Sequence, residues 1–427
     1  MSFTSGTLGI VAGLLLWTAP APAATVTARD RVELDTRLGS LDWRDVDYVA
    51  APGEVNRLEL TETAGHGLRL RDPAGITATP PCVQEDPQTA SCPPHGGRIL
   101  RVSLGDGDDR VSQALGLYGV NTNVDAGDGN DIVEFPLAAL VLGGPGDDTL
   151  AGERVLGGPG ADVMTAETLD YSDHAEGVTV DLAGGTAGAA GENDQIAPGT
   201  EILYGGSGPD VLRAPLGGGV IIHSHDGADV IEGSDGNESL NGGPGNDVIR
   251  ARGGRDWLTG DAGDDQLDAG AGPDTTYAGD GNDRLDGGAG RDELHGERGT
   301  DVLLARDGER DAVGCGGPFD GDRATIDTAD EDTWCPHVSG ARRLILHGIT
   351  RVGVRSAQIV LSCRAARACT GRLRVDGGRV AQRRVRVPAG RRRSVALRLD
   401  RAGGAVEVEV VTPRNGVLRA RLGEARR

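Results

Sequence analysis

The chain has 427 residues, of which 65 are acidic and 43 are basic, so its formal net charge is −22. Seventy residues are glycine and only 3% are aromatic, which is thin for an enzyme built around one large conventional core. The negative charge argues against nucleic acid as the main partner. Beyond the N-terminus no apolar run is long enough for a transmembrane span. What remains is an acidic, glycine-rich protein that is disordered, repetitive or cation-binding.

The N-terminus resembles a secretory signal peptide. An apolar stretch runs from Leu8 to Trp17 and is followed by the small-x-small sequence Ala21-Pro22-Ala23, as at a cleavage site. A membrane anchor is the alternative, but the stretch is too short to span a bilayer. Residues 1–7 lack the Arg or Lys that usually opens such a peptide. We therefore predict a signal peptide over 1–23 and a secreted, extracellular protein.

Six cysteines form three close pairs, as expected for disulfides in an exported protein. The pairs are Cys82 with Cys92, Cys315 with Cys335, and Cys363 with Cys369. Metal binding is the alternative, but Cys-x-x-Cys spacing is absent and only His337 lies near a pair at ligand spacing. We therefore predict local disulfides.

Residues 24–103 contain short stretches in which apolar and polar residues alternate, as in Arg57–Leu60 and Gly67–Leu70. Such alternation predicts half-buried β-strands. From residue 104 the chain repeats a nine-residue unit with glycine fourth, an acid sixth and an apolar residue eighth. Five irregularly spaced copies precede residue 224, and their sixth residues are Asp109, Asp131, Asp148, Asp162 and Asp210.

Two stretches among these copies break the pattern. Within 166–204 only Gly177–Leu182 alternates like a strand. In 214–222 Gly219 takes the place of the acid, so we expect that turn to bind nothing.

Residues 224–304 consist of nine uninterrupted copies, all with glycine at position four. Position eight is Ile or Leu except at Thr276. Position six is acidic in every copy: Asp229, Glu238, Asp247, Asp256, Asp265, Asp274, Asp283, Asp292 and Asp301.

Each unit reads as a glycine turn followed by a short strand with one apolar side chain at its centre. One unit cannot bury that side chain alone, but two units make an eighteen-residue coil, and stacked coils bury it between two parallel sheets. The turns then line both edges of the stack. Alternate acids share an edge, so Asp247, Asp265 and Asp283 lie on one and Asp256, Asp274 and Asp292 on the other.

Stacked turns bring carboxylates to about 4.8 Å spacing, where they repel each other. A cation between successive turns would relieve the repulsion, and carboxylate and carbonyl oxygens in relaxed geometry favour Ca²⁺. The regular block has room for about seven such ions.

The motif G-G-x-G-x-D-x-apolar-x resembles that of repeat-in-toxin (RTX, hemolysin-type) calcium-binding proteins. The resemblance covers about 104–304. It implies a parallel β-roll that folds when Ca²⁺ binds, with the sixth-position carboxylates and turn carbonyls as ligands. The implied metal residues are the fourteen acids named above. Glu238, one methylene longer than Asp, and the arginines of ARGGRD and GGAGRD depart from the pattern and weaken those sites.

Three other interpretations compete with a calcium-loaded roll. Plain disorder would explain the composition but not the fixed period. EF-hands need flanking helices and a Glu at the twelfth loop position, and the frequent glycines oppose helices. The repeat could also be purely structural and have lost its ions.

The flanking segments complete an all-β prediction. We expect 24–103 to form an N-terminal β cap, because solenoids need closed ends, and 305–340 to form a disulfide-closed end cap. Residues 341–427 carry 22 Arg against five acids, a net +17 that leaves −39 for 1–340. Their recurring strand patterns predict an immunoglobulin-like β-sandwich. Its arginines could form a solvated face, or bind the acidic roll or an anionic cell wall or surface polymer.

No motif for catalysis occurs. HExxH, GxSxG and Walker sequences are absent. His223 and His225 could bind a transition metal but lie at a repeat junction, and His174, in the acidic insert, has no obvious nucleophile partner. We therefore predict a non-enzymatic, extracellular calcium-binding protein that folds on binding Ca²⁺ and acts as a structural or cell-surface adhesion module. The alternative is a secreted hydrolase with an unrecognised active site.

Overall fold

The structure is a computed structural model that describes residues 23–35, 39–63, 67–93, 98–113, 121–316, 322–327, 330–333, 335 and 337–340, and the strands within 343–422. Over 27–35, 39–45, 98, 331–333, 337–340 and the strands within 343–422 it describes the backbone alone. The described residues form strands, turns and bends without any helix. It follows that they contain no helix long and apolar enough to cross a membrane. The predicted signal peptide lies outside the described residues.

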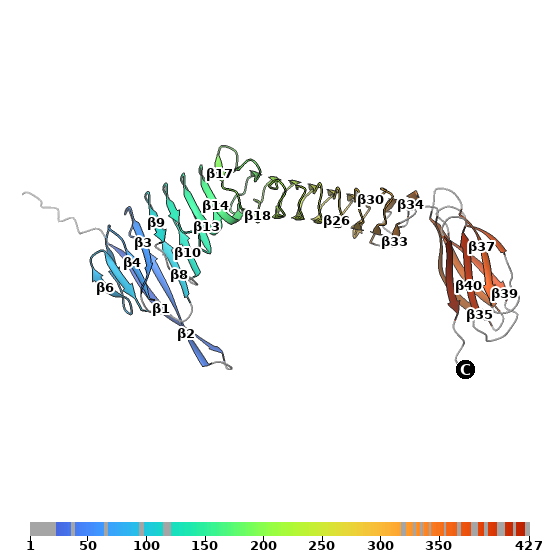
Figure 1. Ribbon diagram of the computed structural model, residues 1–427, viewed down its shortest axis with the longest axis horizontal. Helices are drawn as coiled ribbons and strands as arrows, with labels where there is room; N and C mark the ends of the chain where they lie inside the picture. The colour runs from blue at the N-terminus through green and yellow to red at the C-terminus, as the bar shows by residue number, and fades with distance from the viewer. Residues whose placement is uncertain are drawn as a thin grey trace, which may run out of the picture. The chain divides into compact units, whose positions relative to one another are not determined.

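The chain divides into two compact units, the first of which ends at Gly129. Its strands are β1 (Ala24–Asp35), β2 (Gly39–Val49), β3 (Arg57–Glu62), β4 (Leu68–Arg71), β5 (Ile76–Ala78), β6 (Val83–Asp86), β7 (Thr89–Cys92), β8 (Arg98–Ser103), β9 (Arg110–Gln113) and β10 (Asn121–Asp125) (Figure 1). Antiparallel pairs join β1 to β2, β3 to β4, and β7 to both β4 and β6. Parallel pairing joins β8 to β2 and β10 to β8. Leu58, Leu70 and Leu100 are buried there.

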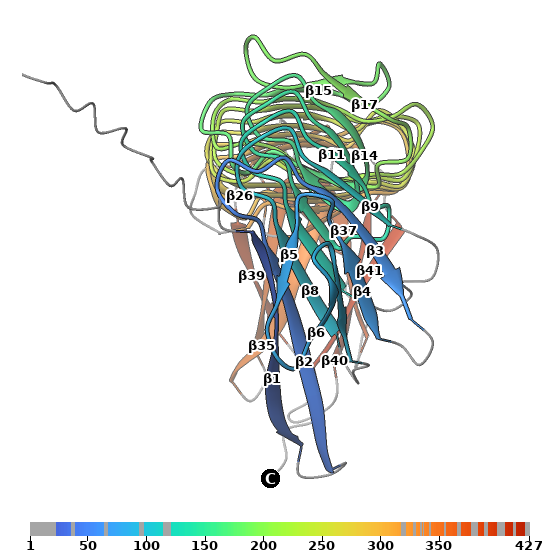
Figure 2. The same cartoon turned by 90° about the vertical axis from the view of Figure 1, so that its left-hand side faces the viewer.

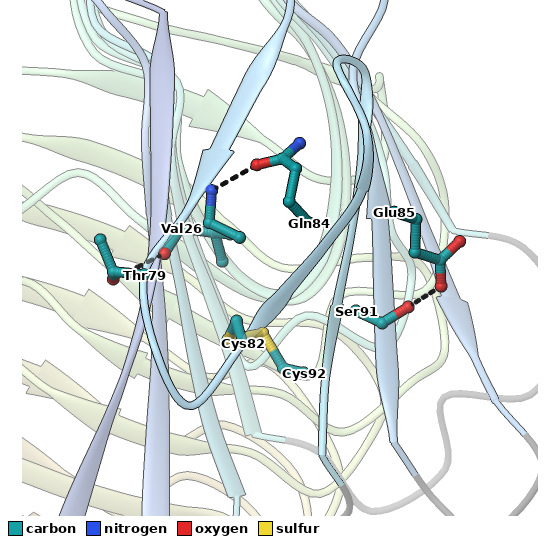
Figure 3. Close-up of a disulfide and its surroundings, with 8 residues drawn as sticks. Val26, Thr79, Cys82, Gln84, Glu85, Ser91 and Cys92 are labelled. Atoms are coloured by element: carbon teal, nitrogen blue, oxygen red, sulfur yellow. Dashed lines mark hydrogen bonds between the residues drawn. A yellow bond between two sulfur atoms is a disulfide. The ribbon is translucent and has the colours of Figure 1, made fainter.

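A disulfide joins Cys82 to Cys92 in this unit (Figure 3). Both cysteines are buried, and the loop before β6 is held by Thr79, whose N–H and hydroxyl both donate to the Val26 carbonyl. This is one of the predicted pairings.

The second unit begins with the parallel roll. Its strands are β11 (Ile132–Glu134), β12 (Leu140–Leu142), β13 (Thr149–Leu156), β14 (Val163–Asp170), β15 (Thr179–Asp181), β16 (Thr186–Ala187), β17 (Asp194–Ile196), β18 (Ile202–Tyr204), β19 (Val211–Arg213), β20 (Ile221–His223), β21 (Val230–Glu232), β22 (Ser239–Asn241), β23 (Val248–Arg250), β24 (Trp257–Ala262), β25 (Gln266–Asp268), β26 (Thr275–Gly281), β27 (Arg284–Asp286), β28 (Glu293–His295), β29 (Arg298–Gly299), β30 (Val302–Ala305), β31 (Ala312–Gly314), β32 (Arg323–Ile326), β33 (Glu331–Thr333) and β34 (His337–Gly340).

The predicted parallel β-roll is confirmed. From β18 onward alternate strands pair in two parallel sheets, one through β20, β22, β24, β26 and β28 and the other through β21, β23, β25 and β27. The register advances by eighteen residues, as between Leu240 and Leu258. Figure 2 looks along this stack, where successive coils overlie one another.

The eighth-position side chains form the core between the two sheets. Ile249, Leu258 and Leu285 are fully buried, whereas the flanking seventh and ninth residues are mostly half-buried or exposed. This is the pattern expected of strands that are apolar on one face only. Thr276, the single polar residue at this position, is buried with the others.

The stretch that breaks the repeat pattern forms an insertion in the roll. The segment predicted to alternate like a strand contains β15. This strand pairs in parallel with β19 and in antiparallel fashion with β16, which pairs with β17. The loop that carries β15 and β17 projects beyond the stacked coils (Figure 2).

At the far end of the roll a second predicted disulfide joins Cys315 to Cys335. The remaining strands are β35 (Arg343–Gly353), β36 (Ser356–Arg364), β37 (Cys369–Asp376), β38 (Arg383–Val387), β39 (Arg392–Arg398), β40 (Val406–Thr412) and β41 (Gly416–Leu422). They form one antiparallel sheet of three strands and one of four. The immunoglobulin-like sandwich stays a prediction. The predicted pairing of Cys363 with Cys369 concerns side chains outside the described residues.

Candidate metal centre

Buried carboxylates run along both edges of the roll in two hydrogen-bonded ladders. In each ladder the Oδ1 atom of one acid accepts the backbone N–H of the equivalent residue one coil earlier. On the first edge the donor–acceptor distances are 2.7 to 3.0 Å, and the residues are Asp210, Asp229, Asp247, Asp265, Asp283, Asp301 and Asp322. On the second edge they are Glu238, Asp256, Asp274, Asp292, Asp311 and Asp330.

The looser upstream copies form a shorter ladder of the same kind. Asp131 donates its N–H to Asp148, and Asp148 donates its N–H to Asp162, at 2.8 and 2.9 Å. Their spacings of 17 and 14 residues, read from their numbers, explain why periodicity alone did not give their register. In the first unit, Oδ1 of the buried Asp109 accepts the N–H of Asn56 at 2.6 Å.

Four acids that the sequence analysis did not assign also occupy ladder positions: Asp194, Asp311, Asp322 and Asp330. Asp311, Asp322 and Asp330 follow the preceding acid of their own ladder by 19, 21 and 19 residues instead of eighteen. Asp194 comes from the insertion, where it accepts the N–H of Asp162 at 3.0 Å. The repeat continues in degraded form over 305–340, beginning ARDGERDAV, and this signal could have found Asp311, Asp322 and Asp330. Nothing in the repeat pattern pointed to Asp194.

In most of these turns the second carboxylate oxygen has no hydrogen-bond donor. This Oδ2 atom is buried and has no hydrogen-bond partner in Asp148, Asp162, Asp247, Asp256, Asp265, Asp274, Asp283, Asp292 and Asp311. A buried polar atom without a partner costs about 1–3 kcal/mol, and more when it is charged. The cost repeats at every coil, so the ladders present a row of anionic oxygens that require a cation.

Glycine at the first turn position leaves room for this oxygen to lie against the turn. A Cβ added to Gly242 would lie 2.3 Å from Oδ2 of Asp247, and one added to Gly260 would lie 2.4 Å from Oδ2 of Asp265. Both contacts are closer than real Cβ atoms allow, so a side chain in this conformation would collide with the oxygen. Glycine at these two positions therefore provides the space that the second oxygen occupies.

Burial dominates the electrostatics of the ladders. Desolvation raises the pKa of Asp148, Asp247, Asp265 and Asp292 to about 7, and neighbouring carboxylates add to the increase. The accepted backbone N–H works in the opposite direction. Without a bound cation the roll thus holds carboxyl groups whose charged form is disfavoured near neutral pH.

The metal-ligand atoms available at the turns decide which metal ion fits them. Among the described residues no three His, Cys, Asp or Glu side chains are close enough together to hold a metal ion. Each turn supplies one ladder carboxylate, so the remaining ligands would be backbone carbonyls. An all-oxygen set with one carboxylate per turn fits Ca²⁺, which accepts relaxed geometry, better than a transition metal.

The histidines noted in the sequence analysis contact aromatic or acidic side chains. The rings of His223 and His225 both stack on Tyr204, with centroids 5.2 and 5.7 Å away. His174 lies between Asp173 at 2.8 Å and Glu192 at 3.2 Å. The hydrogen bond that His174 donates to Asp173 is the main reason that its pKa rises to about 9.

Comparison with known families agrees with this geometry. The family model described as the RTX calcium-binding nonapeptide repeat matches four stretches, 197–214, 221–249, 241–276 and 277–309. No curated protein matches the chain. The matched stretches include the coils whose acids, from Asp210 to Asp301, form most of both ladders. The chain therefore carries RTX-type calcium-binding nonapeptide repeats that form a parallel β-roll.

Proposed function

We propose that the roll folds when Ca²⁺ binds and that the folded roll serves as a rigid extracellular module. The observation that carries this proposal is the row of buried Oδ2 atoms without donors, exemplified by Asp247, Asp265 and Asp283 on the first edge. Bound Ca²⁺ supplies positive charge and ligand positions to these oxygens. The chain itself supplies the stacking, through the Oδ1 hydrogen bonds and the buried eighth-position residues.

The energetics favour coupling between binding and folding. Each coil buries few apolar atoms, in keeping with the low aromatic content, while it must desolvate two carboxylates. An ion that binds only the folded state stabilises it by about 2.7 kcal/mol per site at a concentration 100 times Kd. Extracellular calcium modules typically have Kd of about 10⁻⁴ to 10⁻³ M, so the chain would stay unfolded at cytosolic calcium levels.

A calcium titration of the full chain tests this proposal. Circular dichroism should show strand signal rising with Ca²⁺ and falling again on addition of EDTA, and calorimetry should show uptake of several ions. Mg²⁺ at the same concentration is the control, and it should be much less effective because it demands tighter octahedral geometry. Strand signal that ignores both Ca²⁺ and EDTA, without calcium uptake, would contradict the proposal.

Export to an oxidising compartment is part of the same proposal. The disulfides Cys82–Cys92 and Cys315–Cys335 support it, because such bonds persist mainly outside the cytosol. The signal-like sequence over 1–23 supports it as well. Expression in the native host followed by N-terminal sequencing of the protein in the medium should give a start near Ala24; intact protein retained in the cell would count against export.

For the biological role we propose adhesion, with the roll as spacer and the arginine-rich segment 341–427 as binder of an anionic surface polymer. Its net charge of +17 supports this. The full chain in Ca²⁺ should bind a polyanionic cell-wall polymer, and binding should weaken between 50 mM and 500 mM salt. Replacing Arg391, Arg392 and Arg393 by Gln should weaken it further, whereas binding that ignores both changes would refute this role.

We also propose that the chain is not an enzyme. The support is that the roll's paired carboxylates are accounted for by the ladders. Reproducible hydrolytic activity of the purified chain against polysaccharide, lipid or peptide substrates would overturn this part, provided the activity is absent from a preparation treated in the same way without the chain.

A further inference from the structure

Among the six-residue turns that end in an acid of the repeat, two have a backbone conformation that differs from the others. In the regular turns the second residue has a positive φ, for example 84° at Gly243 and 81° at Gly288. Even the non-glycine residues Asp261 and Glu297 take this conformation, with φ of 73° and 60°. The exceptions are Gly206 and Ser234, second residues of the turns 205–210 and 233–238, neither of which has a positive φ.

The same two turns supply their acid with donors that the regular turns lack. The N–H of Gly206 donates to Oδ2 of Asp210 at 2.7 Å. The N–H of Ser234 lies 3.4 Å from Oε2 of Glu238, and the Ser234 hydroxyl donates to Oε1 at 2.6 Å. Because φ sets the direction of a residue's own N–H relative to the turn, the altered conformation and the added donors belong together.

The result is visible at the carboxylate oxygens. Asp210 accepts hydrogen bonds at both oxygens, one from Gly206 and one from Val178. Glu238 likewise has donors at both of its oxygens, and the added methylene places its buried carboxylate against Ser234. Further along the same edge, Asp274 has a buried Oδ2 without a partner. Glu238 therefore receives its hydrogen bonds from within its own turn, whereas the second oxygen of Asp274 still requires a cation.

We propose that Ser234 takes the place of a calcium ion in the turn 233–238, so that Glu238 is held by the chain's own donors and binds no metal. This inference rests on the proposed calcium binding of the regular turns. Ser234 is then the residue that prevents its turn from binding calcium. The two-edged roll begins with turns that bind no metal: the turn of Asp210 on the first edge, and the turns of Gly219 and Glu238 on the second.

A gain of calcium binding tests the assignment. The double variant S234G/E238D changes the turn from GSDGNE to GGDGND, which restores the complete repeat motif. The reciprocal variant D261S/D265E converts a regular turn whose second residue already tolerates a side chain. Calcium content of the full chain after equilibrium dialysis should rise by about one ion in the first variant and fall by about one in the second. A correctly folded S234G/E238D chain with unchanged calcium content would overturn the proposal.

A second pair of variants decides the question even if the double variants do not fold. Glu238→Gln removes the charge but keeps an acceptor for Ser234, so calcium content should equal that of the unaltered chain. Asp265→Asn makes the equivalent charge change in an open turn and should lose calcium. Loss of an ion in E238Q would show that Glu238 is a ligand and refute the inference. Absence of calcium from the unaltered chain would instead refute the proposed function.

Discussion

The backbone N–H of Asp247 donates a 2.8 Å hydrogen bond to Oδ1 of Asp265, the equivalent residue one coil further along the roll. Oδ2 of the same Asp265 is buried and has no donor. One carboxylate therefore does two things, since its first oxygen fixes the stacking of the coils and its second creates the demand for a cation. Stacking and ion binding cannot be separated at this residue, and the predictions below follow from that link.

Neutralising two ladder acids should weaken calcium binding on the first edge. In D265N/D283N the amide oxygens can still accept the N–H groups of Asp247 and Asp265, but two negative charges are lost. We expect calcium affinity measured by calorimetry to fall at least about tenfold, because ligand charge sets affinity in such sites. D268N/D286N is the matched control: it removes two charges from ninth positions, one exposed and one half-buried, and should bind as the unaltered chain does.

Low pH should stabilise the calcium-free roll and should weaken calcium binding. Burial raises the pKa of Asp247 and Asp292 from 3.8 to about 7, so the protonated form is the one the fold prefers. This contribution is fully present below about pH 4 and is lost as the pH rises through about 7. In calcium-free buffer, strand signal should be greater at pH 5 than at pH 8, while calcium affinity should increase over the same interval. More strand signal at pH 8 without calcium would contradict this.

Thr276 offers a stabilising substitution. Its side chain is buried at a core position, and its Oγ1 has no hydrogen-bond partner. Valine has nearly the same shape without the hydroxyl, so Thr276→Val should raise the stability of the calcium-loaded roll by about 1–2 kcal/mol. Thermal unfolding in saturating Ca²⁺ measures the change. Thr275→Val, at a half-buried outer position, is the control, and an equal gain there would show that burial of the hydroxyl is not the cause.

Close stacking makes one glycine indispensable, whereas a glycine on the opposite edge of the roll is replaceable. A Cβ on Gly263, where φ is 143°, would lie 1.5 Å from the carbonyl oxygen of Gly245 on the previous coil. At Gly253 the nearest atom would be 3.4 Å away. We expect Gly263→Ala to cost more than about 2 kcal/mol and Gly253→Ala to cost less than about 1, as measured by unfolding in Ca²⁺. Similar losses in both variants would contradict the stacking described here.

Hydrogen exchange should separate the metal-free part of the roll from the rest. Tyr171 donates to Oδ2 of Asp194 at 3.1 Å, and Gly206 donates to Asp210, so the insertion and the coil after it satisfy these acids internally. On removal of calcium, amides of 239–304 should lose protection first, and those of 163–213 should retain more of theirs. Loss of protection at the same calcium concentration in both segments would contradict this order.

Much of the roll followed from local spacing. Glycine at position four and Leu or Ile at position eight predicted the turn, the strand and the eighteen-residue coil, and the register between Leu240 and Leu258 confirms them. The alternation of acids between two edges follows from the same period, as the ladder from Asp247 to Asp265 shows. These features could be predicted because each depends on residues within one or two repeats.

The sequence by itself determined the repeat, its period and the residues at each turn, because turn and strand preferences act over a few neighbouring residues. Only the tertiary structure decided which carboxylates have donors. The roles of Asp194 and Ser234 depend on contacts across an insertion and on one φ angle, neither of which appears in a nine-residue pattern. Whether Glu238 needs a cation is thus decided by where a hydroxyl and an N–H point, and that direction exists only once the coils are stacked.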